Sequence, residues 1–119
     1  MNSNAKEFIA LLFLSRDVAH KAHLNTTSYA QHKALGHFYE DMIELADKFA
    51  EAYMGRVGER IGELPDLKNP EGDIVKILKA HLEIIEEMRD FVKDDSPLCN
   101  IIDEIVGLYL STLYKLTLK

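Results

Sequence analysis

The 119-residue sequence contains one cysteine, no tryptophan and only three prolines, all of them in the second half. Because Cys99 has no second cysteine to pair with, a disulfide within the chain is excluded. A single cysteine with no disulfide fits a protein of a reducing compartment. We therefore expect a cytoplasmic protein, long enough to form one hydrophobic core without disulfides.

Long apolar runs are also missing. The run from Phe8 to Leu14 is too short to cross a bilayer and is flanked on both sides by charged residues. It has neither the basic start nor the small-residue cleavage site of a signal peptide. We interpret this run as part of a buried helix, and we expect no membrane partner.

Positive charge is scarce, since 14 lysines and arginines face 20 aspartates and glutamates, for a formal net charge of −6 at pH 7. An acidic surface repels phosphate, so a nucleic-acid partner would need a local basic patch or tail. The segment Met1 to Asn4 has no basic residue, and the C-terminus has only Lys115 and Lys119. Nucleic-acid binding is therefore expected to be absent or weak.

The sequence shows no nucleophile–base pairing, glycine-rich phosphate loop or zinc ribbon. It also lacks the period-two alternation of strands, and its apolar residues recur at helical spacing instead. This pattern predicts one all-α domain over residues 1–119, with helices at about 5–24, 29–61, 70–93 and 97–118. The expected start signals are Ser28 with Gln31, Asn69-Pro70 and Ser96-Pro97.

The connections between these helices predict an antiparallel four-helix bundle, since two are short and one is of moderate length. The connection after the second helix would cover only about 30 Å even when fully extended. It therefore fits an up-down pair of neighbours, or a crossover only if the second helix ends early. The first helix is apolar on several sides, through Ile9, Phe13 and Leu14, and this favours a contact with another subunit.

Imidazole and carboxylate side chains gather between residues 20 and 51. His20 and His23 end the first predicted helix, and His32 opens the second. The carboxylates that follow at helical spacing are Glu40, Glu44, Asp47 and Glu51. On a wheel of about 100° per residue, these second-helix residues lie along one flank of the apolar stripe, with Glu44 at its outer margin. Such ligands suit iron, manganese or zinc.

Each of these residues also has a structural interpretation. A helix C-terminus favours cations, which accounts for His20 and His23 without a metal. Asp47 and Glu51 could lie on a solvated flank or form ion pairs with lysines, for which Lys21, Lys33 and Lys48 are available. His81 stands alone on an apolar face and is expected to be a hydrogen-bonded core histidine.

The spacing of the ligand-type residues resembles that of the Dps group, the mini-ferritins of the ferritin-like superfamily. In that group the first helix ends in a His-x2-His-Trp-Asn-type segment. The second helix carries a His, followed fifteen and nineteen positions later by Asp and Glu. Here His20-x2-His23-Leu24-Asn25 stands at the first place, and Asp47 and Glu51 follow His32 by fifteen and nineteen positions. The resemblance covers most of the chain, with a shortened region between the second and third helices.

The resemblance implies a ferritin-like bundle that forms a homo-oligomer, either a two-fold pair or a larger shell. It also implies iron sites between subunits, where histidines of one chain meet carboxylates of another. The implied ligands are His23 or His20, His32, Asp47 and Glu51, with Glu40 and Glu44 as accessory oxygen ligands. The implied activity is that of a ferroxidase, which oxidises Fe(II) with oxygen or peroxide.

The sequence departs from the Dps pattern at several places. His20, rather than His23, lies at the family's twelve-residue distance from His32, and both assignments stay open. Gly36 stands where the family often has an acidic ligand, and no lysine-rich DNA-binding tail is present. A competing register aligns Gly58-Glu59-Arg60-Ile61 with the family's Ala-Glu-Arg-Ile and would undo the assignment of the two carboxylates. The alternatives are a helical interaction module that has lost its metal, and a non-catalytic metal-binding bundle.

Overall fold

The computed structural model describes residues 2–119, and every regular element within that range is a helix. The helices are α1 (Ser3–Asn25), α2 (Tyr29–Val57), α3 (Ile74–Met88) and α4 (Ser96–Lys115), and a short 3-10 helix, η1 (Arg89–Val92), follows α3. The prediction of an all-helical bundle with four helices is confirmed.

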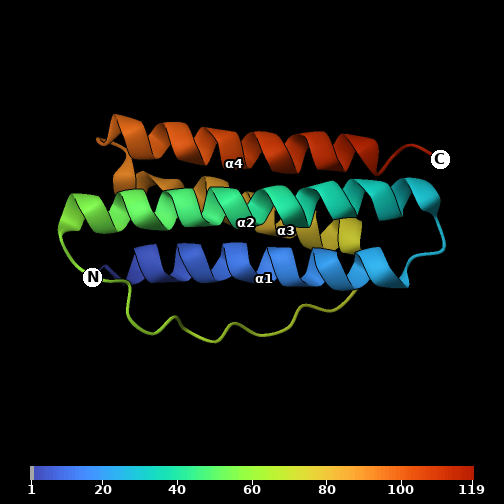
Figure 1. Cartoon of the computed structure of the whole chain (residues 1–119), viewed down its shortest axis with the longest axis horizontal. Helices are drawn as coiled ribbons and strands as arrows, with labels where there is room; N and C mark the ends of the chain where they lie inside the picture. Colours follow the sequence, from blue (N-terminus) through green and yellow to red (C-terminus); the bar gives the residue numbers. More distant parts are fainter. Residues whose placement is uncertain (1) are drawn as a thin grey trace.

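The four helices contact one another as a ring, in which α1 packs on α2 and α3, and α4 packs on the same two helices. In Figure 1, α1 runs from left to right, α2 returns, α3 takes the same direction as α2, and α4 runs back. Since α2 and α3 begin at the same end, the connection 58–73 carries the chain back along the length of the bundle.

The predicted boundaries on either side of this connection were wrong. The second helix was expected to reach residue 61, but it ends at Val57 because Gly58 adopts the left-handed conformation, with φ 72° and ψ 26°. The third helix was expected from residue 70, but it begins at Ile74, where the Asp73 side chain accepts a hydrogen bond from the backbone N–H of Val75 at 3.1 Å. The second helix thus ends early, as a crossover requires.

The other predicted ends lie close to the observed ones, with differences that follow from capping. Ser28 caps α2 as expected, because its hydroxyl accepts the backbone N–H of Gln31 at 3.2 Å. The start of α4 is capped by Asp95, one residue before the expected Ser96. The third predicted helix, expected to reach residue 93, ends at Met88 and continues as the tighter η1. The fourth, expected to reach residue 118, ends at Lys115.

The connection 58–73 lies along α1, as Figure 1 shows. Every third residue in its middle is half-buried, and the residues between are exposed. The half-buried residues are Ile61, Leu64, Leu67 and Pro70. A repeat of three is that of a polyproline II helix, whose backbone is satisfied by water. The connection therefore covers one side of the bundle with a row of apolar side chains, although it forms no helical hydrogen bonds.

The core contains one chain of polar side chains among its apolar residues. The Tyr109 hydroxyl from α4 donates to the Ser15 hydroxyl oxygen of α1 at 2.5 Å, and Ser15 lies 2.6 Å from Nδ1 of His81 in α3. All three residues are buried. Burial lowers the pKa of His81, which fits a neutral ring that accepts the Ser15 proton at Nδ1. The expectation that His81 is a hydrogen-bonded core residue is confirmed.

Candidate functional site

Two of the predicted ligands, His23 and His32, face each other where α1 ends and α2 begins. Their rings are stacked, with centroids 3.8 Å apart and planes 16° from parallel. Nδ1 of His23 lies 2.6 Å from the backbone carbonyl oxygen of His32, and Nδ1 of His32 lies 2.8 Å from that of His23. We call this reciprocal pair the histidine clasp. It joins the last turn of α1 to the first turn of α2.

The hydrogen bonds of the clasp determine which ring nitrogens remain available. A carbonyl oxygen only accepts hydrogen bonds, so Nδ1 of each ring must carry the proton and donate it. In the neutral form of either ring, Nε2 then keeps its lone pair. Metal-binding histidines commonly have this arrangement, with one nitrogen bound to a backbone carbonyl and the other to the metal. The clasp therefore holds His23 and His32 in a tautomer that leaves Nε2 of each ring able to bind a metal.

The third predicted histidine, His20, is joined to the clasp through Tyr39. The rings of His20 and Tyr39 are stacked, with centroids 4.0 Å apart, and Tyr39 meets the His23 ring edge-on at 5.3 Å. The structure thus pairs His32 with His23 and places His20 one aromatic ring further away. Sequence reasoning did not assign Tyr39 to the site, although its position three residues after Gly36 places it beside the clasp.

Gly36 makes room for the clasp. A Cβ atom at this position would lie 3.1 Å from Cε1 and 3.2 Å from Nδ1 of His23, which is closer than ordinary van der Waals contact. At the position where the Dps pattern often has an acidic ligand, this chain therefore has a residue that lets the His23 ring approach α2. The glycine at position 36 thus explains both the missing acidic ligand and the close packing of the His23 ring.

A surface hollow of about 180 Å³ opens beside the clasp. Its lining comprises His23, His32, Lys33, Gly36, His37 and Glu40. The predicted accessory residue Glu40 thus lies at the clasp, whereas Glu44 lies one turn further along α2, and both are exposed. His37 also borders this hollow and was not predicted as a site residue, because on a helical wheel it faces away from the apolar stripe.

Asp47 and Glu51 lie on the same helix as His32 but far from it. A helix rises 1.5 Å per residue, so spacings of fifteen and nineteen residues place these carboxylates roughly 22 and 28 Å from His32 along α2. Both residues are exposed. Within residues 2–119, no group of three or more His, Cys, Asp or Glu side chains has the geometry of a metal site. A single chain therefore does not bring Asp47 and Glu51 to the two histidines.

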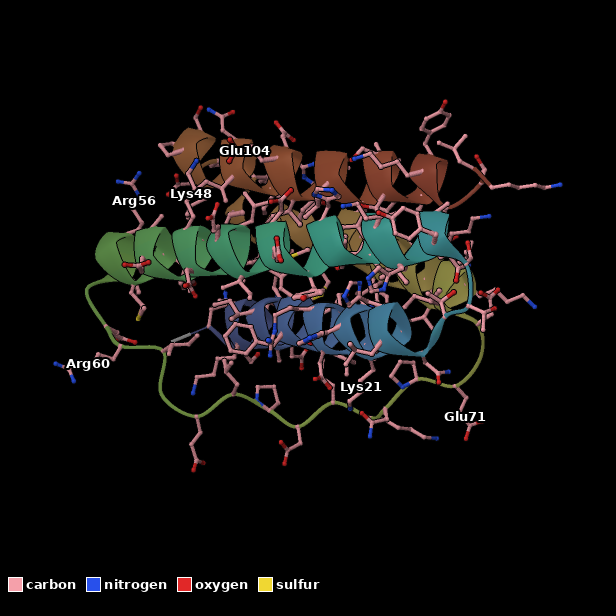
Figure 2. All side chains as sticks on the ribbon, turned by 45° about the vertical axis from the view of Figure 1, so that its right-hand side comes forward. Lys21, Lys48, Arg56, Arg60, Glu71 and Glu104 are labelled. Carbon is pink, nitrogen blue, oxygen red and sulfur yellow. The ribbon has the colours of Figure 1, made fainter. Side chains whose placement is uncertain are left out.

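Two of the three lysines considered as ion-pair partners of these carboxylates pair elsewhere. Nζ of Lys48 lies 3.0 Å from Glu104, so this pair joins α2 to α4, and Figure 2 shows the two side chains between these helices. Nζ of Lys21 lies 2.9 Å from Asp17 on α1 itself. Within residues 2–119, neither Asp47 nor Glu51 takes part in a salt bridge. Both carboxylates thus remain available to a partner.

Asp47 borders a second hollow, of about 180 Å³, in the groove between α1 and α2. Its lining comprises Leu12, Phe13, Arg16, Met42, Ile43, Ala46 and Asp47. Phe13 and Ile43 are large apolar residues, yet 44% and 41% of their surfaces are exposed. The same pair of helices thus carries the histidine clasp at one end, exposed apolar side chains in the middle and two carboxylates beyond.

Comparison with known proteins gives the chain a family. Residues 23–116, a range that contains the clasp, Asp47 and Glu51, match the model of DUF5856, which is described as a family of unknown function. An uncharacterized 14.6 kDa protein in the mobD-ri intergenic region of Enterobacteria phage T4 is 31% identical over 119 residues, covering 98% of this chain and 91% of the phage protein.

Two further findings were negative. No solved structure matches the chain. Among the helices within residues 2–119, none is long and apolar enough to cross a membrane. These findings leave the Dps resemblance a prediction, because neither the family nor the phage protein carries a described function. The family match, which spans most of the chain, and the phage relative agree that this protein belongs to the DUF5856 family.

Proposed function

We propose that this protein is a homo-oligomeric, Dps-like iron-binding protein that oxidises Fe(II) at sites shared between subunits. In this proposal His23 and His32 of one subunit bind iron together with Asp47 and Glu51 of a second subunit. The observation that carries the proposal is the histidine clasp, in which both rings donate through Nδ1 and keep Nε2 for a metal.

A partner subunit is needed because the two halves of the site lie on one face but far apart. His32, Ile43, Asp47 and Glu51 fall within about 100° of one another around α2, and Ile43 and Asp47 among them line the α1–α2 groove. A two-fold axis through the middle of this groove would bring the carboxylates of one chain toward the clasp of the other. Exposed Phe13 and Ile43 in the middle of the face supply apolar surface for such a contact.

The path of the chain supports the ferritin-like part of the proposal. Helices that contact each other run in opposite directions, and one long crossover joins α2 to α3. An antiparallel bundle with a single long crossover is the topology of ferritin-like folds. Fold alone does not establish an activity, so the proposed chemistry depends on the clasp and the carboxylates.

Iron is the substrate in this proposal, and the protein supplies ligands and position. Imidazole and carboxylate ligands with open coordination positions suit Fe(II). Zinc or manganese could occupy the same ligands, and zinc would do so without being oxidised. Two Fe(II) ions give one electron each to one peroxide molecule, which takes up two protons and leaves as two waters. Glu40, beside the clasp, and Glu44 offer oxygen ligands to iron leaving the site. A cytoplasmic location would provide Fe(II), because that compartment is reducing.

The test combines metal binding with subunit mixing. Purified protein is titrated anaerobically with Fe(II), and Fe(II) oxidation is then followed after addition of peroxide. We expect His32→Ala and the double variant Asp47→Asn, Glu51→Gln to lose most of the oxidation, whereas His37→Ala, which changes a histidine beside the same hollow, should keep it. Equal oxidation by wild type and His32→Ala would refute the proposal.

Mixing the two defective variants tests whether the site is shared. If it is shared, a mixed pair contains one site with an intact set of ligands, because each chain supplies the half that the other lacks. Refolding the variants together should therefore restore part of the oxidation. No restoration, in a mixture shown by mass to contain both chains in one oligomer, would exclude sites between subunits.

A helical interaction module is the second candidate. It is favoured by large apolar side chains that remain exposed, including Leu24 and Tyr29 beside the α1–α2 turn. In that case the histidine clasp would serve only to stabilise the turn between α1 and α2. The oxidation assay separates the two candidates, since an interaction module would bind Fe(II) no better than its His32→Ala variant does.

A further inference from the structure

The outer side of α4 carries an apolar surface that the bundle does not use. Leu110 and Tyr114 are 54% and 65% exposed and lie one turn apart, away from the buried residues of this helix. Leu118, three residues beyond the end of α4, is 50% exposed. Since α4 packs on α2 and α3, this surface faces away from the α1–α2 groove.

The apolar row on α4 begins with a glycine whose open space could receive a side chain of a partner. Gly107 lies on the same outer side, one turn before Leu110, and no atom lies within 4 Å of the position that a Cβ would occupy there. Gly107 and Tyr114 are nearly equidistant from Leu110, on opposite sides of it. When two such helices pack in opposite directions across Leu110, the Tyr114 ring of each would lie over the Gly107 notch of the other.

The charges along α4 would also be complementary in such an antiparallel pair of helices. Asp103 and Glu104 lie near its start, and although they pair with Arg89 and Lys48, their side chains remain 63% and 52% exposed. Lys115 and Lys119 lie at and beyond its end, and within residues 2–119 they form no salt bridge. In an opposed pair of helices, the basic end of one chain would meet the acidic end of the other, as an isologous contact requires.

We propose that the outer face of α4, from Asp103 to Lys119, binds the same face of a second copy of this chain in antiparallel orientation. The apolar row, the Gly107 notch and the charged ends share one centre near Leu110. This interface is separate from the α1–α2 groove and does not depend on iron. If both faces are used, each chain contacts two partners, and the assembly is larger than a dimer.

The first test measures mass in solution over a concentration series, by sedimentation or light scattering. Tyr114→Asp should weaken self-association by about tenfold or more, because it places a charge within an apolar contact. Ile84→Asp, which alters an exposed apolar residue on α3, is the matched control and should have no effect. Tyr114→Asp should also leave Fe(II) oxidation unchanged, so that failure of either proposal is recognised separately.

Two further variants test the orientation. Lys115→Glu should weaken association, and adding Glu104→Lys should restore it, because an antiparallel pair brings these two positions together. Leu110→Cys, in a Cys99→Ser background, should form a disulfide between chains on oxidation, whereas Ile84→Cys should not. The inference is overturned if Tyr114→Asp leaves the mass of the assembly unchanged, or if Leu110→Cys cross-links no faster than Ile84→Cys.

Discussion

At the scale of single residues, the site depends on a glycine as much as on its histidines. Gly36 has the space that the His23 ring fills, and the ring is held there by its hydrogen bond to His32 and by contact with Tyr39. Because the ring is held on several sides, it has little freedom to move away from a larger neighbour. A methyl group at position 36 would therefore act directly on the clasp.

This predicts opposite effects for two glycine-to-alanine changes in α2. Gly55→Ala adds a methyl group where no atom lies within 4 Å, so it should raise the free energy of unfolding by about 0.5–1 kcal/mol through helix propensity. Gly36→Ala should give no gain or a loss, because its methyl group would displace the His23 ring. Chemical denaturation of both variants measures the difference. An equal gain at both positions would show that the ring moves freely.

A second prediction concerns His81, whose pKa burial lowers below its usual value of about 6.5. Below pH 6.5 the unfolded chain binds a proton at this ring that the folded chain does not, so the unfolded state is favoured by acid. The contribution of His81 to stability should be complete above pH 6.5 and should decline as the pH falls toward the folded-state pKa.

The measurement compares urea denaturation of wild type and His81→Gln at pH 7.5, 6.5 and 5.5. Glutamine cannot take up this proton, so the stability of the variant should depend less on pH over this interval. Other groups titrate in both proteins and cancel in the comparison. Parallel pH profiles would mean that His81 is protonated as easily in the folded chain as in the unfolded one.

At the scale of elements, the helices were predictable and the connection 58–73 was not. The helical spacing of apolar residues predicted the positions of all four helices, because each helix buries one apolar face. The connection repeats every three residues, which matches neither a helix nor a strand, so its apolar row was not recognised. Asn69-Pro70 also has the form of a helix start, but Pro70 packs as the last residue of the row and Asp73 caps α3 instead.

The row in the connection leads to a prediction about stability. Leu64→Ser should lower the free energy of unfolding by about 1 kcal/mol, because it removes apolar surface that is partly buried against the core. The neighbouring Glu63→Ser should have little effect, since Glu63 is exposed. Thermal denaturation of the two variants side by side measures this. Similar melting temperatures would show that the connection does not stabilise the bundle.

The candidate site was predictable only in part, for a similar reason. That the histidines gather near the α1–α2 turn follows from their positions at two helix ends. Their stacking depends on the path of residues 26–28 and on the space at Gly36, and neither is encoded by a spacing rule. The distance from His32 to Asp47 follows from helix geometry alone. Which chain supplies the carboxylates is a property of the assembly, which one sequence does not specify.

At the scale of the whole molecule, the negative charge determines which partners are favoured. The formal net charge of −6 is unfavourable for nucleic acid and leaves association between copies to apolar faces with local charge complementarity. The two proposed faces lie on different sides of the bundle, one on α1 and α2 and the other on α4. Two separate faces of this kind allow an assembly to extend beyond a pair.

We therefore predict that the protein does not retain duplex DNA. Binding to phosphates strengthens as salt is lowered, so an electrophoretic mobility assay at about 50 and 200 mM salt is the informative measurement. No shift is expected at either concentration. A shift at low salt that disappears at high salt would reveal a basic surface formed on assembly, because the single chain has a formal net charge of −6.

The crossover between α2 and α3 also divides the polypeptide into two helical hairpins, which are joined by one tether, the connection 58–73. Arg60, which projects from this tether in Figure 2, and Lys68 are exposed, and the backbone between them lacks helical hydrogen bonds. A protease that cuts after basic residues would thus reach the tether before it reaches the helices. The two fragments, α1 with α2 and α3 with α4, would remain associated through the shared core. Two fragments produced separately would then be able to assemble into the same bundle.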